Sequence, residues 1–518
     1  MSEQSIFEKI FGVKLSQNQA YALALSLMII VSAVSGVSGD LLRDVLGFGE
    51  KALTREQVQE IIEEHIDLGL GGSPYMTEKP CTLIIDSVTV GVTTYTYGVN
   101  GTDGTLWGYD LDEQSVFEWA FGNFTIGEIY VKSGTYDVVG LTASGITLTG
   151  EGRSSTILRA DGAGDIITMS GTNGLIRNMF IDGNDQANDG VVLSGSRTRA
   201  LNLYIEDCTE AGIEISAAGG AFVEDCRIKQ IGASIRAAGT RGVDIVTTGS
   251  DIEVINCIIS EVEICVYANG GTNRIMDNHL WGGWVGVAVS PSNSHGEHII
   301  SRNFIEDNYA QAVTITGHTA WSVLISDNII DGNVRNGGNS SIWINPLDAP
   351  SQYDAIGILI ANNVYDHVTS TSPLTLPDYH ILIDDSSSVD NTNIRIEGEN
   401  FRGYAYGPTW DQTNPAILFT NPGGNCTLGE CIGFISANSG TGTLPNAGPP
   451  SSVVITHGLE MTPLAEDIII TLTENPTNTP GAVWVDTITA TTFTVNCEND
   501  PGASNLNFSW TANIRVFR

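Results

Sequence analysis

The chain has 518 residues, with 23 Lys and Arg against 60 Asp and Glu, so its formal net charge at pH 7 is −37. Such a charge repels phosphate backbones at long range, which excludes nucleic acid as an expected partner. Charged residues make up only 16% of the chain, glycines number 58, and short Val-, Ile- and Thr-rich segments recur, so we expect an all-β protein.

Residues 20–37 form an uncharged apolar run, AYALALSLMIIVSAVSGV. At about 1.5 Å per residue, a helix of this length is near the minimum that spans a hydrocarbon core of roughly 30 Å. Lys9 and Lys14 precede the run and Asp40 follows it. We therefore expect residues 1–40 to be a single-pass membrane anchor, with the body of the chain outside a cell or virion. A cleaved signal peptide and a buried helix are the alternatives.

Residues 41–72 contain a pattern typical of a short amphipathic helix. Thr54 and Gln57 have the spacing of a capping box. One apolar stripe follows, formed by Val58, Ile61, Ile62, His65 and Ile66. The stripe predicts either self-association into a small bundle or a helix that lies on the next domain.

An asparagine between two short apolar runs recurs along the body of the chain. The phrase is centred on Asn178, Asn202, Asp225, Asn256, Asn278, Asn303, Asn328, Asn363 and Asn400, at steps of 24, 23, 31, 22, 25, 25, 35 and 37 residues. A shortest step near 22 with occasional insertions is typical of a solenoid. Each repeat also holds a second alternating strand. We therefore predict a right-handed parallel β-helix over residues 146–437, preceded by a cap at residues 73–145.

The recurring asparagines are predicted to be structural. Asparagine tolerates the left-handed backbone of a sharp bend, and its amide can bond to the same residue in the next coil. The expected ladder consists of Asn178, Asn202, Asn256, Asn278, Asn303, Asn328 and Asn363.

Four segments before the repeats carry a resemblance to a known family. In order they are GVNGTDGT, DEQSVFEWAF, GEIYVKSGTY and ITLTGEGRSSTIL. Their order and spacing resemble the opening of the pectate-lyase-superfamily β-helices found in many phage tailspikes, although Lys132 and Ser133 replace the usual prolines. The resemblance covers about residues 95–400 and implies the same fold.

The C-terminal region resembles the small β-domain that ends many phage tail fibres. The matching residues include Thr456-His457-Gly458-Leu459, Trp484-Val485 and Phe508 with Trp510. The resemblance implies a β-sandwich-like tip at residues 453–518, usually trimeric in that family, and residues 438–452 are predicted to be a Gly/Pro/Ser linker. Apolar residues such as Trp484, Phe493 and Trp510, together with the helical stripe, favour a homotrimer.

Outward positions of the predicted strands offer two polar candidate sites. Glu214 and Asp244 fall at equivalent positions of successive coils, about 4.8 Å apart, as a carboxylate pair that could cleave glycosidic bonds. Asp182, Asp185 and Asp189 cluster beside a turn and could bind Ca²⁺, the one cofactor considered. A solvated acidic face and an Asx-rich loop are the alternatives.

Four tryptophans are candidates for sugar binding, because aromatic faces stack on sugar rings. They are Trp281, Trp284, Trp321 and Trp343. Packing in the core or between subunits is the alternative.

Two functions follow from these observations. The first is a membrane-anchored, trimeric spike or tail-fibre-like adhesin on a virion or cell surface, which binds a host-surface polysaccharide or glycoprotein. The alternative is a polysaccharide lyase, hydrolase or epimerase on the same β-helix. The sequence shows no match to the basic catalytic residues of the lyase family, which favours the adhesin.

Overall fold

The computed structural model describes residues 55–70, 81–90, 93–102, 104–217, 219–232, 234–246, 251–269, 271–290, 296–317, 320–333, 340–346, 356–366, 377–384, 392–401, 416–420, 425–446, 448–475, 478–502 and 505–514. The chain divides into two compact units, Met1–Asn123 with Gly127–Gly134, and Phe124–Ile126 with Thr135–Arg518. Residues 20–37, the predicted membrane anchor, lie outside the described residues. Among the residues that are described, no helix is long and apolar enough to cross a bilayer.

The first unit is a small sheet with helices. Its elements are α4 (Arg55–Leu70), β1 (Leu83–Val90), β2 (Thr93–Asn100), β3 (Leu106–Asp110), α5 (Glu113–Asn123) and β4 (Glu128–Val131). Strands β1, β2 and β3 are antiparallel, and β4 runs parallel to β1. Val58 and Ile62 of α4 are buried in one cluster with Ile84, Tyr97 and Val99 of the sheet. These two residues of the predicted stripe therefore pack on the chain's own sheet, as the second interpretation of the helix expected, and are not free to form a bundle.

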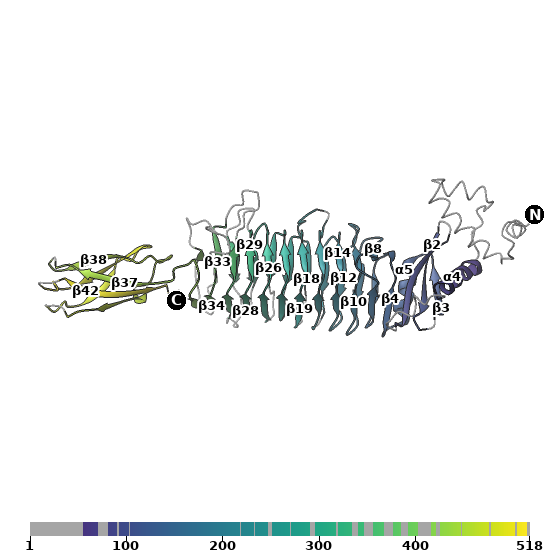
Figure 1. Ribbon diagram of the computed structural model, residues 1–518, viewed down its shortest axis with the longest axis horizontal. Coiled ribbons are helices and arrows are strands. Elements are labelled where there is room, and N and C mark those ends of the chain that lie inside the picture. The colour runs from purple at the N-terminus through teal and green to yellow at the C-terminus, as the bar shows by residue number, and fades with distance from the viewer. Residues whose placement is uncertain are drawn as a thin grey trace, which may run out of the picture. The chain divides into compact units, whose positions relative to one another are not determined.

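The second unit contains a parallel β-helix of three sheets, which we call A, B and C (Figure 1). Within this unit, sheet A consists of β7 (Thr147–Gly150), β10 (Leu175–Arg177), β13 (Arg199–Leu201), β16 (Phe222–Glu224), β19 (Ile252–Ile255), β22 (Asn273–Met276), β25 (Gly296–Ser301), β28 (Ala320–Ser326), β31 (Ile356–Ala361), β34 (Thr392–Glu397) and β36 (Asn425–Leu428). Sheet B consists of β5 (Gly134–Val138), β8 (Thr156–Ala160), β11 (Phe180–Asp182), β14 (Tyr204–Glu206), β17 (Arg227–Lys229), β20 (Ile258–Ser260), β23 (His279–Trp281), β26 (Phe304–Glu306), β29 (Ile329–Asp331) and β32 (Val364–Asp366). Sheet C consists of β6 (Leu141–Ala143), β9 (Ile167–Met169), β12 (Asp189–Leu193), β15 (Ala211–Ile215), β18 (Arg241–Ile245), β21 (Ile264–Ala268), β24 (Val285–Val289), β27 (Val313–Gly317), β30 (Ser340–Pro346), β33 (Tyr379–Asp384) and β35 (Ile417–Thr420).

Aliphatic side chains stacked coil upon coil form the core of the β-helix. In sheet B, Ile181 is in register with Ile205, which is in register with Ile228 of the next coil, and all three are fully buried. The central residue of each three-residue strand points inward because side chains alternate along a strand. Burial therefore depends on the neighbouring coil, which is why the sequence repeats.

A left-handed residue occupies the corner between sheets A and B in eight successive coils, from β10–β11 to β31–β32. In the first coils this residue is Asn178, Asn202, Asp225 or Asn256, with φ between 51° and 57°. In the later coils it is Asp277, Arg302, Asp327 or Asn362, with φ between 56° and 58°. The corner residue thus precedes Asn278, Asn303, Asn328 and Asn363 by one position. The recurring asparagine of the sequence therefore occupies two different structural positions, which are the left-handed corner and the position directly after it.

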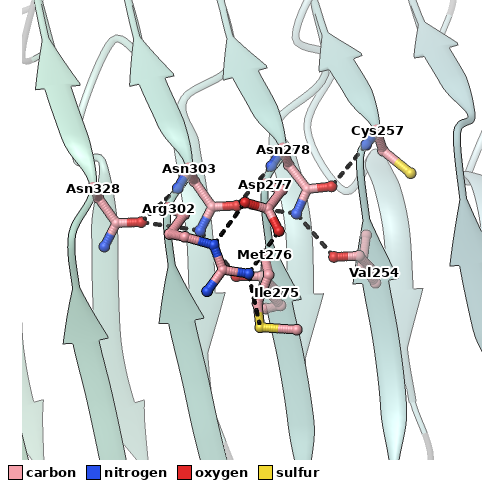
Figure 2. A network of polar contacts seen from close by, with 9 residues as sticks. All are labelled: Val254, Cys257, Ile275, Met276, Asp277, Asn278, Arg302, Asn303 and Asn328. Atoms are coloured by element: carbon pink, nitrogen blue, oxygen red, sulfur yellow. Dashed lines mark hydrogen bonds and ion pairs between the residues drawn. The ribbon is translucent and has the colours of Figure 1, made fainter.

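Asn278, Asn303, Asn328 and Asn363 form a buried hydrogen-bonded ladder inside this corner. Figure 2 shows the first three of them. The side-chain Nδ2 of Asn278 donates to Oδ1 of Asn303 at 3.0 Å, and the same contact joins each further pair at 2.9–3.0 Å. Each Nδ2 also donates to a backbone carbonyl of the preceding coil, such as that of Val254 for Asn278. The ladder ends on Glu399, whose Oε1 accepts the Nδ2 of Asn363 at 3.1 Å.

Asn178, Asn202 and Asn256, which the sequence also placed in the ladder, lie outside this buried row. They occupy the left-handed corner, where Asn178 and Asn202 are half-buried and Asn256 is exposed. Only one side-chain bond, from Nδ2 of Asn202 to Oδ1 of Asn178 at 2.8 Å, joins two of the three. The buried position beside them holds Met179, Leu203 or Cys257 instead. Because asparagine suits both positions, the alignment of the repeats matched the corner asparagines of the early coils with the ladder asparagines of the later coils, one residue out of register.

A C-terminal β-domain follows the β-helix in sequence. Its elements are β37 (Ala437–Leu444), β38 (Ser451–Thr456), the 3-10 helix η1 (Ala465–Asp467), β39 (Ile468–Leu472), β40 (Val483–Asp486), β41 (Thr492–Cys497) and β42 (Leu506–Asn513). They form two antiparallel three-stranded sheets, ordered β37-β42-β39 and β38-β41-β40.

The predicted linker at residues 438–452 is not a linker, because residues 438–444 belong to β37, which pairs with β42 along its whole length, and residues 451–452 begin β38. Its glycines are packing positions. A Cβ on Gly442 would lie 2.3 Å from the ring of Phe508, and one on Gly440 would lie 2.9 Å from the ring of Trp510. The aromatic residues of β42 therefore need glycine opposite them.

Candidate functional site

The outward face of sheet C carries a row of side chains that meet across successive coils. The register joins Val192, Glu214, Asp244, Tyr267, Ala288, Thr314, Trp343 and Leu382. Glu214 and Asp244 are therefore direct neighbours on β15 and β18, as the alternation of the sequence predicted. The next place is held by Tyr267. The alternation of the sequence, extended to β21, predicts Cys265 at this place, but Cys265 is fully buried and its Sγ faces the carbonyl of Ile259.

A cation and an aromatic ring accompany the two carboxylates. The Nη1 of Arg241 donates to Oδ2 of Asp244 in an ion pair, and the exposed fractions of the two side chains are 28% and 13%. The guanidinium of Arg241 lies 3.8 Å from the ring centroid of Tyr267. Cation–π attraction thus holds Arg241 between the acid of one coil and the ring of the next. We call Glu214, Arg241, Asp244 and Tyr267 the sheet C cluster.

Both carboxyl groups of the cluster favour the protonated form more than an ordinary carboxyl does. Burial raises the pKa of Glu214, and the nearby charge of Asp244 raises it further. Burial also raises the pKa of Asp244, while the ion pair with Arg241 opposes that rise. Burial is thus the main cause of both raised pKa values, and raised carboxyl pKa values also occur in acid–base sites.

Asp189, at the start of β12, is a third acidic group near the cluster. Its side chain is buried, and Oδ1 accepts the backbone N–H of Ala211 at 2.8 Å. Burial, followed by the charges of Glu214 and Asp165, raises the pKa of Asp189 to about 7. A carboxyl group with this pKa can gain or lose a proton near neutral pH.

The structure does not support the predicted Ca²⁺ site at Asp182, Asp185 and Asp189. Asp185 is exposed at a left-handed turn, Asp182 accepts the N–H of Asn184, and Asp189 is buried on β12. Throughout the described part of the chain, no three His, Cys, Asp or Glu side chains gather as a metal site. The spacing in sequence reflects a turn between two sheets, which sends the carboxylates to different environments.

The four tryptophans do not form one surface. Trp281 ends β23 in sheet B, half-buried, and Trp343 lies in the outward row of sheet C between Thr314 and Leu382. Trp284 lies in the turn after β23, with its ring 5.8 Å from that of Tyr309 in an edge-to-face contact. Trp321 is part of β28 in sheet A, but its side chain is outside the described residues. Only Trp343 shares a face with the sheet C cluster.

Sequence reasoning missed several members of these networks. Arg241 and Tyr267 were not singled out, although Arg241 lies three residues before Asp244 and could have been found as a charge partner. Asn308 and Asn333 were also missed, yet they form a second buried pair, with Nδ2 of Asn308 donating to Oδ1 of Asn333 at 2.9 Å. Each lies five residues after a ladder asparagine, and that shared offset was the available signal.

Comparison with known proteins supports the fold. A family model described as "Right handed beta helix region" matches residues 122–259 and 189–345. The match and the three parallel sheets together confirm the right-handed parallel β-helix that the sequence predicted for the body of the chain. No curated protein matches the chain.

Solved structures to which this chain is similar include the A-module of a mannuronan C-5 epimerase from Azotobacter vinelandii, at 15% identity and a TM-score of 0.47 over 62% of this chain and 91% of that one. The tailspike of Pseudomonas phage phi297 gives 11% identity and a TM-score of 0.48 over 82% and 73%. The Dettilon tailspike protein gives 14% identity and a TM-score of 0.45 over 78% and 91%. Similarities at this level of identity and TM-score leave the activity of this chain open.

Proposed function

We propose that this protein is a surface spike that binds glycans along the outward face of sheet C. One observation carries the proposal: Glu214, Asp244 and Tyr267 lie side by side in three successive coils, with Arg241 between the last two. Carboxylates and a guanidinium hydrogen-bond to hydroxyl groups, and a tyrosine ring offers an apolar face. A repeating surface of this kind suits a repeating polymer.

A glycan array with the full-length protein in detergent tests this proposal. Once a ligand is found, Tyr267→Ala should weaken its binding by roughly 3- to 10-fold, because the aromatic contact is lost. The matched control is Phe304→Ala, which removes an outward ring of sheet B in register with His279. The proposal is wrong if no glycan binds, or if both substitutions weaken binding equally.

The raised pKa values of Glu214, Asp244 and Asp189 favour a second candidate, an enzyme that cleaves or modifies the glycan. A carboxyl with a raised pKa keeps its proton to a higher pH and can donate it to a leaving oxygen, and an ionised neighbour can assist on the other side. Glu214→Gln and Asp244→Asn should then abolish new reducing ends or unsaturated products while leaving glycan binding measurable. If the unsubstituted protein binds a glycan but forms no product from it, the enzyme is refuted and only the adhesin remains.

Membrane anchoring through residues 20–37 is part of the same proposal. Its support is the length and apolarity of that segment and the lysines before it. Deletion of residues 1–40 should release the protein from membranes without loss of β-structure. Continued membrane association of the shortened chain would refute the anchor and, with it, the placement on a virion or cell surface.

A homotrimer is the assembly that we propose, with the C-terminal domain as its contact. Phe493 and Trp510, which the sequence suggested for this role, are buried inside the domain. Trp484, the third residue that the sequence suggested, is exposed, as are the large apolar side chains of Val454, Leu464, Ile469 and Leu472. Covering such surface on three neighbouring chains would stabilise the assembly. Light scattering should report three chains per particle, and Val454→Asp with Ile469→Asp should lower that number; a monomer would refute the proposal.

A further inference from the structure

The corner between sheets A and B holds an open cavity of about 370 Å³, away from the sheet C cluster. Its lining includes the left-handed corner residues Asn202, Asp225 and Asn256 of three successive coils. Two arginines complete it: Arg153, from the segment between β7 and β8, and Arg227, the first residue of β17. Four coils therefore contribute polar side chains to one depression.

The two arginines differ from most others in the described part of the chain. Six arginines form an ion pair with a carboxylate there, namely Arg159, Arg199, Arg241, Arg274, Arg302 and Arg395. Arg153 and Arg227 are exposed, and within the described residues neither forms an ion pair. The guanidinium of Arg227, which lines the cavity, lies 5.5 Å from the ring centroid of Tyr204.

The same corner is neutralised further along the β-helix. There Arg302 pairs with Asp277 of the preceding coil, at 2.7 and 2.8 Å, so a corner cation and a corner anion cancel (Figure 2). At the cavity, the corner residue of the coil after Asp225 is Asn256, which carries no charge. The two arginines of the cavity are not corner residues. Two arginines and one aspartate leave a net positive charge in a chain whose formal charge is −37.

We propose that this cavity binds the acidic group of a saccharide, with Arg153 and Arg227 on the oxyanion. Guanidinium groups donate paired hydrogen bonds that match the oxygens of a carboxylate, sulfate or phosphate. The carboxylate of Asp225 repels a second anionic group but accepts a hydrogen bond from a hydroxyl. The exposed amide of Asn256 can donate a hydrogen bond to the acidic group or to a hydroxyl oxygen of the ligand. A ligand with one acid beside hydroxyl groups, such as a uronic acid residue, satisfies all of these partners.

Isothermal titration of the full-length protein with glucuronate, glucose and inorganic phosphate tests the site. Glucuronate should bind and glucose should not, and Arg153→Gln and Arg227→Gln should each weaken glucuronate binding by roughly fivefold or more. The matched control is Arg302→Gln, which removes a corner arginine that already has a partner and should leave binding unchanged. Tyr267→Ala should also leave it unchanged, which separates this site from the sheet C cluster.

The outcomes discriminate clearly. Loss of glucuronate binding in Arg153→Gln and Arg227→Gln, but not in Arg302→Gln, supports the site. Displacement of bound glucuronate by phosphate would indicate that the acidic group lies between the two arginines. Phosphate binding without glucuronate binding would refute the saccharide and leave a site for a free ion. Equal binding of glucose, equal loss in Arg302→Gln, or no binding at all would overturn the proposal.

Discussion

Replacing Glu399 by glutamine should stabilise the protein, and increasingly so as the pH rises. Glu399 is fully buried at the end of the asparagine ladder, where its Oε1 accepts both the backbone N–H and the Nδ2 of Asn363 at 3.1 Å. Burial raises its pKa from 4.5 to about 8. A protonated carboxyl still accepts both bonds through its carbonyl oxygen, and glutamine has the same shape without the ionisable proton.

The magnitude follows from the two pKa values. Because the folded-state pKa lies above the unfolded value, the carboxyl favours folding fully below pH 4.5, and this contribution is lost as the pH rises to about 8. Each pH unit in that window costs about 1.4 kcal/mol. Glu399→Gln should therefore be stabilising by about 3 kcal/mol at pH 7 and about 5 kcal/mol above pH 8, with little difference near pH 4.5.

Thermal unfolding followed by circular dichroism between pH 4.5 and 8.5 measures this gap. The melting temperature of the variant should exceed that of the unsubstituted protein by several degrees at pH 8, and the two should converge at pH 4.5. Glu430→Gln, which replaces an exposed carboxylate, should show no such trend. A constant gap across the pH range, or a variant less stable at pH 8, would refute the assignment of a neutral buried acid to the ladder end.

Three further changes test the fold and the site. Asn328→Ala should cost about 1 to 3 kcal/mol, because the Nδ2 of Asn303 loses its acceptor, whereas Asn256→Gly at the exposed corner should change the melting temperature little; equal effects would contradict the ladder. Gly442→Ala should destabilise the C-terminal domain by about 1 to 3 kcal/mol through contact with Phe508, with the exposed Thr441→Ala as control, and an unchanged melting profile would mean that β37 is not packed there. Arg241→Gln should raise the pKa of Asp244 further, since the ion pair lowers it, and a carboxyl titration by NMR that moved downward would contradict the pairing.

The β-helix could be predicted because its signal is repeated many times. Alternation of Ile213 and Ile215 around Glu214 recurs in each coil, so an error in one strand is corrected by its neighbours. A prediction for a single position is not corrected by its neighbours in this way. Cys265 follows Ile264 and precedes Val266, and three apolar residues in a row hide which one faces outward.

Other misinterpretations came from residues that serve two physical purposes. Asparagine suits a left-handed bend and a buried ladder, so Asn256 and Asn278 seemed equivalent in sequence although one is exposed and the other buried. Glycine permits flexibility and also close approach, so the Gly440 and Gly442 of β37 resembled a linker. The structure separates these cases because only the neighbours of each residue, which are distant in sequence, decide its role.

The central claim is that glycans bind across the coils of sheet C. Hydrogen exchange of the full-length protein, with and without a glycan selected on the array, measures this directly. The account predicts added protection in Ala211–Ile215, Arg241–Ile245 and Ile264–Ala268, the strands that carry the sheet C cluster. Protection confined to the C-terminal domain, with these three strands unchanged, would contradict it.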